Sequence, residues 1–174
     1  GLGDVYKRQW NDCVRALYDK ETLREVLKAL IATRYNIHSV NSLKQDLYTQ
    51  EELDAAVDEA HRQGVKIAVH SGTQPSIQMC IDAGFDTIEH GTFLTEAQAR
   101  QMAKKGIAWT PTITAYTYLY EQTKQMIEAG VDMDNPIAAR AVHDQAFFKP
   151  AFEAYRDNFK KLYDTGVTVL AGSD

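Results

Sequence analysis

The sequence predicts an α/β fold in which parallel strands alternate with helices. The main observation is a pattern that occurs four times: a helical segment ends in a polar residue and a glycine, and an apolar run follows directly. The four glycines are Gly64, Gly84, Gly106 and Gly166. Glycine tolerates the left-handed backbone just past a helix end, so it is the expected residue there. Four helix–glycine–strand units in one chain indicate parallel strands joined by helical crossovers.

Short polar motifs mark where the predicted helices begin. Thr49-Gln50-Glu51-Glu52 fits a capping box, and Thr95-Glu96-Ala97-Gln98 fits the variant with glutamine. Pro75 suits the first turn of the helix that carries Ile77 and Cys80. A further helix is predicted over residues 19–30, ahead of the first capping box.

Five strands are predicted, over residues 34–40, 65–70, 85–90, 107–112 and 167–172. The regular spacing fails between the last two, where helical segments over 122–129 and 136–163 are read as a long insertion. Insertions on the strand-exit side of a barrel usually shape a substrate pocket. A closed eight-stranded β/α barrel typically needs about 250 residues. The chain has 174 residues, and it is therefore predicted to be an incomplete (β/α)8 TIM barrel.

Composition excludes several classes of partner. The net charge is −5 and the basic residues do not cluster, which argues against nucleic acid or an anionic membrane surface. No apolar run approaches the roughly 20 residues that span a bilayer. Cys13 and Cys80 are too few for a disulfide framework and are read as small buried residues. Any targeting segment would lie upstream, so localisation is left open, with the cytoplasm as the default.

The first nine residues are predicted to be non-native. Asp4-Val5-Tyr6-Lys7-Arg8-Gln9 resembles the in-frame translation of a transposase-end adapter used in sequencing libraries. The predicted division is therefore a segment 1–9 of adapter origin and a partial barrel domain over residues 10–174. Continuous coding sequence upstream of Asp4 in independent reads would contradict this division.

Three ionisable residues stand at the carboxyl ends of predicted strands. His70 ends the run from Val65, His90 ends the run from Phe85, and Asp174 follows Gly172-Ser173 at the end of the chain. The carboxyl ends of neighbouring parallel strands meet at one edge, where catalytic groups of such folds lie. Two imidazoles and a carboxylate can hold a divalent metal and move protons on a bound water. His61 and His143, by contrast, are read as structural and solvent-facing.

These motifs resemble the amidohydrolase superfamily. The segments are Val69-His70-Ser71, Ile88-Glu89-His90-Gly91-Thr92 and Ala171-Gly172-Ser173-Asp174. The helical segment 51–64 and Trp109-Thr110-Pro111-Thr112 are similar to the imidazolonepropionase-like and Xaa-Pro-dipeptidase-like branch. The resemblance covers residues 34–174, and it implies roughly strands 4 to 8 of the barrel, with the helical insertion after strand 7.

The resemblance also implies roles for single residues. His70 matches the fifth-strand metal ligand. His90 matches the sixth-strand histidine, which binds a second metal in binuclear members and the substrate in mononuclear ones. Asp174 matches the eighth-strand aspartate, which is both a metal ligand and the proton shuttle. The implied cofactor is a divalent metal, with zinc as the first choice and one or two ions undecided.

Two departures from the family pattern bear on the number of metal ions. The first-strand His-x-His pair of the family is absent from the sequence. At the fourth-strand position, where many binuclear members carry a carboxylated lysine, this chain has His38, with Lys44 six residues on. His38 is carried as a candidate metal ligand, with substrate contact or no role as alternatives.

Three functional readings follow. The first is a metal-dependent hydrolase that cleaves the C–N bond of a small amide, cyclic amide or dipeptide-like substrate. For this hydrolase, a homo-oligomer of the full-length protein is a possible partner state. The second is a metal-free β/α-barrel lyase or isomerase in which His and Asp act as acid and base. The third is an inactive fragment, because an open barrel edge exposes unpaired strand and apolar surface.

Overall fold

A computed structural model describes residues 48–130, 132 and 134–172. The predictions made for residues 1–9, the helix 19–30, the strand 34–40, and for Cys13, His38, Lys44 and Asp174 fall outside these described residues. Helices and strands alternate along the first part of the chain. Their order is α3 (Gln50–Arg62), β1 (Ala68–Ser71), α4 (Ser76–Ala83), β2 (Thr87–His90), α5 (Glu96–Lys105), β3 (Ala108–Thr110), α6 (Ile113–Glu128) and α7 (Pro136–Tyr163).

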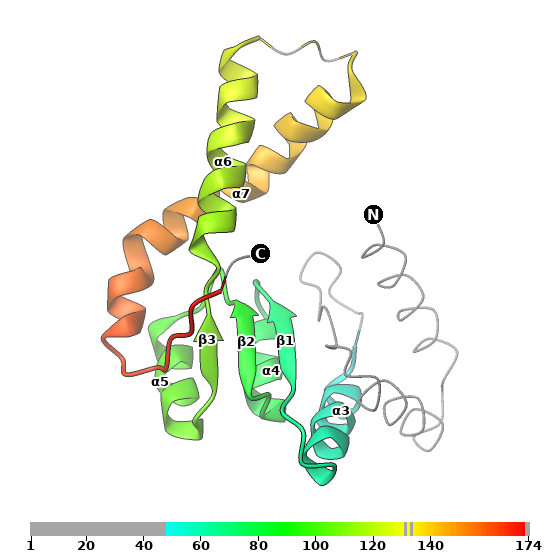
Figure 1. The fold of residues 1–174 in the computed structure, drawn as a ribbon, viewed down its shortest axis with the longest axis vertical. Helices are drawn as coiled ribbons and strands as arrows, with labels where there is room; N and C mark the ends of the chain where they lie inside the picture. The colour runs from blue at the N-terminus through cyan, green and yellow to red at the C-terminus, as the bar shows by residue number, and fades with distance from the viewer. Residues whose placement is uncertain (1–47, 131, 133, 173–174) are drawn as a thin grey trace.

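The strands form a parallel sheet in the order β1-β2-β3, as the helix–glycine–strand pattern predicts (Figure 1). Val69 pairs with Ile88, and Ile88 pairs with Trp109. The segment before the C-terminus runs parallel to β3: the Trp109 N–H donates to the Thr168 carbonyl at 2.8 Å, and the Leu170 N–H donates to the Trp109 carbonyl at 2.8 Å. The predicted strand 167–172 is thus a parallel neighbour of β3, joined by a single bridge at Val169.

Each strand begins later than predicted, and β3 also ends two residues early, at Thr110. For β1 the reason is Asp86. Its carboxylate accepts a hydrogen bond from the Ile67 N–H at 2.9 Å, and its own N–H donates to the Ile67 carbonyl at 3.0 Å. This side-chain bond replaces a rung of the ladder, so β1 begins at Ala68 and Val65 is left exposed.

The helix ends agree with the local signals. Both predicted capping boxes form: the Thr49 hydroxyl accepts from the Glu52 N–H, and the Thr95 hydroxyl accepts from the Gln98 N–H. Gly84 and Gly106 are left-handed at the ends of α4 and α5. Pro75 is the N-cap of α4, one residue before the first turn.

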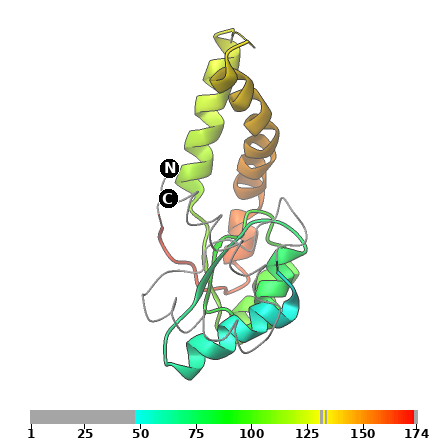
Figure 2. The same ribbon diagram turned by 90° about the vertical axis from the view of Figure 1, so that its right-hand side faces the viewer.

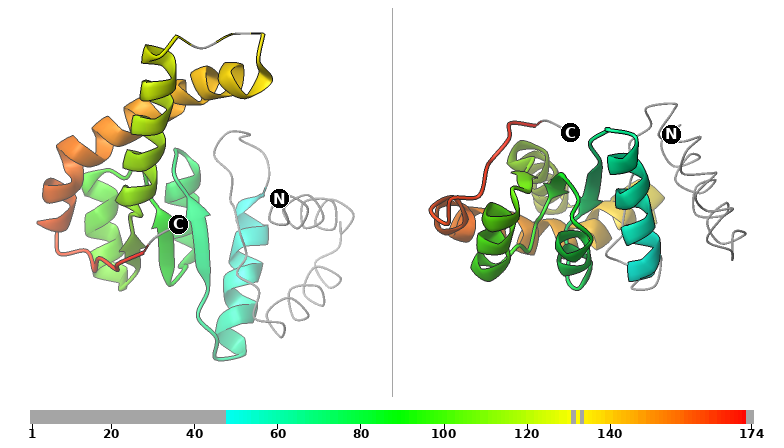
Figure 3. Two further views of the ribbon diagram at one scale, coloured as in Figure 1. Left: turned by 45° about the horizontal axis from the view of Figure 1, so that its top comes forward. Right: turned by 90° about the horizontal axis from the view of Figure 1, so that it is seen from below.

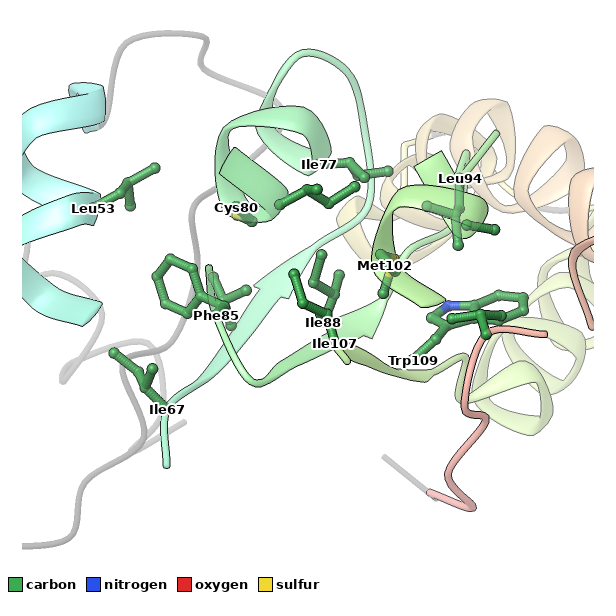
Figure 4. Packing of buried hydrophobic residues seen from close by; sticks show 14 of the residues in the cluster. Leu53, Ile67, Ile77, Cys80, Phe85, Ile88, Leu94, Met102, Ile107 and Trp109 are labelled. Carbon is green, nitrogen blue, oxygen red and sulfur yellow. The ribbon is translucent and has the colours of Figure 1, made fainter. Parts of the chain in front are cut away.

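The core lies between the sheet and the helices on one of its faces, α4 and α5 (Figure 3). Val69, Ile88 and Trp109 are fully buried on this side, and in β1 and β2 such buried residues alternate with half-buried neighbours. Figure 4 shows side chains of both helices meeting the strand residues; those labelled from the helices are Ile77, Cys80 and Met102. The opposite face carries Thr87, Glu89 and Thr110, and the Glu89 carboxylate accepts from both threonine hydroxyls. One face of the sheet is therefore apolar and covered, and the other is polar.

After β3 the regular alternation stops, and α6 and α7 form a helical arm that projects beyond the carboxyl ends of the strands (Figures 1 and 2). Helix α7 has the predicted bounds, whereas α6 begins at Ile113 rather than near residue 122. The alternating Tyr116, Tyr118 and Tyr120 therefore lie on a helix. A spacing of four places Tyr116 and Tyr120 on one side, and Tyr118 is 62% exposed.

Within the described residues, no helix combines the length and the apolar character that crossing a lipid bilayer requires.

Asp86 gives the first stability prediction. Its half-buried carboxylate accepts from Ile67, His61 (2.9 Å) and Lys66 (3.4 Å). Burial alone raises the pKa of Asp86, but these donors outweigh it and hold the pKa below its usual range. A folded-state pKa below the unfolded one stabilises the fold above the unfolded value of about 3.9, and this contribution is lost as pH falls through the folded pKa.

We expect Asp86→Asn to lower the free energy of unfolding by about 1–2 kcal/mol at pH 7, because it weakens charge-assisted hydrogen bonds that are partly open to solvent. The difference from wild type should begin to shrink as pH falls below about 3.9, where the carboxylate of the unfolded chain becomes protonated, and it should disappear below the lower folded-state pKa. Urea unfolding at pH 7 and pH 3 measures it, with the exposed Asp58→Asn on α3 as control. An equal loss at both pH values would rule out this account.

Candidate metal and catalytic site

His70 and His90 meet at the carboxyl edge of the sheet. The His70 Nδ1 and His90 Nε2 atoms are 2.6 Å apart, and the ring centroids are 4.0 Å apart. His90 is the last residue of β2 and is only 3% exposed, whereas His70 is half-buried near the end of β1. Of the three residues predicted to converge, the two histidines are therefore in direct contact.

This contact depends on an unusual backbone at His90. In the register of the sheet, His70 pairs with Glu89, and His90 pairs with Ser71. Paired residues share a face and successive residues alternate, so a regular strand would place the two histidines on opposite faces. His90 instead has a φ of 66°, and Gly91 follows with a φ of 54°. A left-handed histidine is uncommon, and such strained residues cluster at functional sites.

The other ring nitrogen of His90 is held by Thr112. The His90 Nδ1 and Thr112 Oγ1 atoms are 2.6 Å apart, and both side chains are buried. Thr112 is itself left-handed, with a φ of 47°, at the turn between β3 and α6. When Nδ1 donates to this hydroxyl, Nε2 keeps the lone pair that faces His70. A hydrogen bond on one imidazole nitrogen orients the other as a ligand, which is the usual arrangement around histidines that bind metals.

The backbone carbonyl of His90 is also held. It accepts a hydrogen bond from the Trp109 indole N–H at 2.6 Å and from the Tyr155 hydroxyl at 3.0 Å. Trp109 belongs to β3 and Tyr155 to α7, so two further elements contact the same residue. Gly91 is needed next to this carbonyl, because a Cβ atom there would lie 2.6 Å from the indole nitrogen.

Aromatic rings of the arm border the histidine pair. The Tyr116 ring of α6 lies edge-on to the His90 ring, with centroids 5.5 Å apart. Tyr116 also contacts Phe147, Phe148 and Tyr155 of α7. The helical arm therefore reaches the site through packed rings as well as through the Tyr155 hydroxyl.

Asp174 and His38, the other candidate ligands, lie outside the described residues. The segment leading toward Asp174 passes next to the site, because a Cβ atom at Gly172 would meet the methyl groups of Thr110 and Thr112. In the part of the chain that the structure describes, no three His, Cys, Asp or Glu side chains are grouped as a metal site would require.

The remaining histidines of the described chain behave as the sequence predicts. His61 contacts Asp86 near the amino ends of the strands, away from the histidine pair. His143 is 82% exposed on α7. Neither is placed to take part in chemistry with His70 or His90.

Cys80 is buried, as predicted, and burial raises the pKa of its thiol to about 12, although a hydrogen bond with Ser71 opposes this. A thiol with so high a pKa is not a nucleophile at neutral pH.

Sequence reasoning missed Thr112 and Tyr155 as neighbours of the site. Thr112 stands in the Trp109–Thr112 motif that carries part of the family resemblance, and this motif was the available signal. Tyr155 lies 65 residues after His90. No local pattern distinguishes it from the other tyrosines of the chain.

Comparison with known proteins agrees with this architecture. The family model described as Amidohydrolase family matches residues 20–174. The chain belongs to this family.

Among curated proteins, an uncharacterized protein of Mycobacterium tuberculosis (Rv2915c) is 29% identical over 136 residues, which cover 74% of this chain. The match covers 31% of that protein, so the chain spans about a third of the length of the curated relatives it matches.

Solved structures share the fold. A Xaa-Pro dipeptidase with bound methionine in its active site is 30% identical with a TM-score of 0.64, over 87% of this chain and 38% of that one. A prolidase complexed with N-methylphosphonate-L-proline is 24% identical with a TM-score of 0.68, over 90% of this chain and 38% of that one. Ochratoxinase of A. niger is 19% identical with a TM-score of 0.69, over 90% of this chain and 35% of that one. At under 25% identity, it and the prolidase show a shared fold alone.

Proposed function

We propose that this chain forms part of a metal-dependent hydrolase that cleaves the C–N bond of a small amide or dipeptide-like substrate. The observation that carries the proposal is the pair of imidazole nitrogens, His70 Nδ1 and His90 Nε2, facing each other at the carboxyl edge of the sheet. Family membership and the Xaa-Pro dipeptidase structure support the same reaction class. A dipeptide with proline as its second residue is therefore the first substrate to test.

The polar face of the sheet supports a barrel. Parallel sheets are buried on both faces, and within the described residues helices cover only the face of Val69 and Ile88. We propose that β1, β2, β3 and the segment 167–172 are the fifth to eighth strands of a (β/α)8 barrel whose interior contains Glu89 and Thr110. The arm of α6 and α7 is then an insertion after the seventh strand, next to the active-site edge.

The donor set fits a transition metal. Neutral imidazole nitrogens and carboxylate oxygens are the ligands that Zn²⁺ prefers, although Fe, Mn and Co accept the same set. His70 would hold the metal, and Asp174 would join it. His90 would bind a second ion or the substrate, and His38 is a further candidate ligand. Thr112 keeps the His90 imidazole oriented in either role.

Each residue then has a defined task. A divalent ion, when bound, lowers the pKa of water toward about 7 and polarises the scissile carbonyl. Asp174 takes the proton of the attacking water and passes it to the leaving nitrogen. His90 is buried beside Tyr116, so its imidazole would contact the substrate from a fixed position that is shielded from water.

Metal removal tests the proposal. The purified protein should contain about one or two zinc, iron, manganese or cobalt ions by elemental analysis. It should hydrolyse at least one member of a panel of Xaa-Pro dipeptides, other dipeptides and cyclic amides. Dialysis against a chelator should abolish turnover, and adding Zn²⁺ or Mn²⁺ back should restore it. Turnover that survives complete metal removal would instead favour metal-free acid–base chemistry, and a metal-free protein inert on the whole panel would refute the proposal.

A further inference from the structure

Two buried donors converge on one backbone oxygen beside the site. The His90 carbonyl accepts from the Trp109 indole and from the Tyr155 hydroxyl, and both donor side chains are almost fully buried. The oxygen belongs to the residue whose left-handed backbone brings the imidazole onto His70. Holding this carbonyl therefore fixes the orientation of the peptide plane between His90 and Gly91.

Tyr155 is itself oriented by a second hydroxyl. The Tyr155 Oη and Thr92 Oγ1 atoms are 3.2 Å apart. Because the Tyr155 hydroxyl donates its hydrogen to the His90 carbonyl, its oxygen can accept a hydrogen bond from the Thr92 hydroxyl. Burial raises the pKa of Tyr155, and the hydroxyl therefore remains a donor at every working pH. Its ring packs on Tyr116, which in turn faces the His90 ring.

We propose that Tyr155 is a positioning residue: its hydroxyl holds the His90 carbonyl so that the imidazole Nε2 stays aimed at the metal-binding position beside His70. The role in turnover rests on the hydrolase proposed above, whereas the effect on the His90 ring does not. The positioning also makes the site dependent on α7, since a shift of that helix would release the carbonyl. The other hydrogen bond to the carbonyl comes from Trp109, which lies on a strand of the sheet rather than on α7.

The ring of Tyr155 fills the core in either case, so the test must remove only the hydroxyl. Tyr155→Phe does so, and Tyr163→Phe makes the same chemical change at a 58% exposed position of the same helix. Thr92→Val serves as a second variant, because it removes the hydroxyl that orients Tyr155 without altering α7.

Three measurements on the intact protein separate positioning from simple stabilisation. In the metal-free protein, the imidazole nitrogen NMR signals of His90 should move in Tyr155→Phe and stay in place in Tyr163→Phe. The affinity for Zn²⁺ in competition with a chelator should fall about 10-fold, the lower end of the range for partners that orient ligands. In the active enzyme kcat should fall by a similar factor, with KM changed less than twofold. Thr92→Val should move each quantity in the same direction by less.

Unchanged His90 signals and Zn²⁺ affinity in a folded Tyr155→Phe protein would overturn the proposal, even if its melting temperature fell. If Tyr155→Phe does not fold, unchanged signals and affinity in Thr92→Val overturn it in the same way. If the wild type proves inactive on every amide, the hydrolase proposal fails alone, and the NMR signals of the metal-free protein still decide whether Tyr155 positions His90.

Discussion

Replacing His70 with alanine is expected to lower kcat/KM by about 10³-fold or more. The reason is that a metal ion supplies several kcal/mol of transition-state stabilisation, and each 1.4 kcal/mol is worth a factor of ten in rate. His70 offers Nδ1 to the space it shares with His90, and it is half-buried rather than part of the packed core. The fold should therefore tolerate the substitution, and circular dichroism and the melting temperature should stay near those of wild type.

The matched control is His143→Ala, which removes an imidazole from an exposed position on α7. It should leave metal content and kcat/KM unchanged. Steady-state kinetics and elemental analysis of both variants provide the measurement. If His70→Ala retains wild-type turnover, His70 is not a ligand of a catalytic metal. If it loses turnover while the wild type works without metal, His70 acts as an acid or base.

Gly91→Ala is expected to destabilise the protein by about 3 kcal/mol. A left-handed φ costs a residue with a Cβ atom about 1–2 kcal/mol, and overpacking a buried site adds about 1–3 kcal/mol. Gly91 has a φ of 54°, and its Cβ would lie 2.6 Å from the Trp109 indole nitrogen. The indole is enclosed in the core, and moving it would break its hydrogen bond to the His90 carbonyl.

Gly84→Ala separates the two contributions. Gly84 has a φ of 85° at the end of α4, but a Cβ there would meet nothing within 4 Å. This control should cost only the backbone term, about 1–2 kcal/mol, and leave the site intact. Urea unfolding gives both free energies. Equal losses in the two variants would show that the contact with Trp109 contributes nothing.

Local signals predicted most element boundaries. The hydroxyls of Thr49 and Thr95 act on amides three residues away, so each capping box could be identified from four consecutive letters. The left-handed glycines Gly84 and Gly106 end helices for the same local reason. Parallel pairing of the strands follows from the helical crossovers between them.

Boundaries set by distant partners could not be predicted in this way. Strand β1 starts late because the Asp86 carboxylate, 19 residues on, takes the Ile67 N–H. Helix α6 starts early because the chain turns at the left-handed Thr112, whose hydroxyl contacts the His90 ring 22 residues back. The tyrosines that follow alternate like strand residues in sequence, yet Tyr116 packs on α7 as a helical residue.

The candidate site divides along the same line. Sequence by itself determined that His70 and His90 stand at the ends of neighbouring parallel strands, because a repeated helix–glycine–strand unit returns each strand to the same edge. Only the tertiary structure decided that the two imidazoles touch. A regular register would separate them, and the left-handed backbone of His90 brings them together. Trp109, Thr112 and Tyr155 hold that conformation from three other places in the fold, and their convergence depends on packing over long sequence distances.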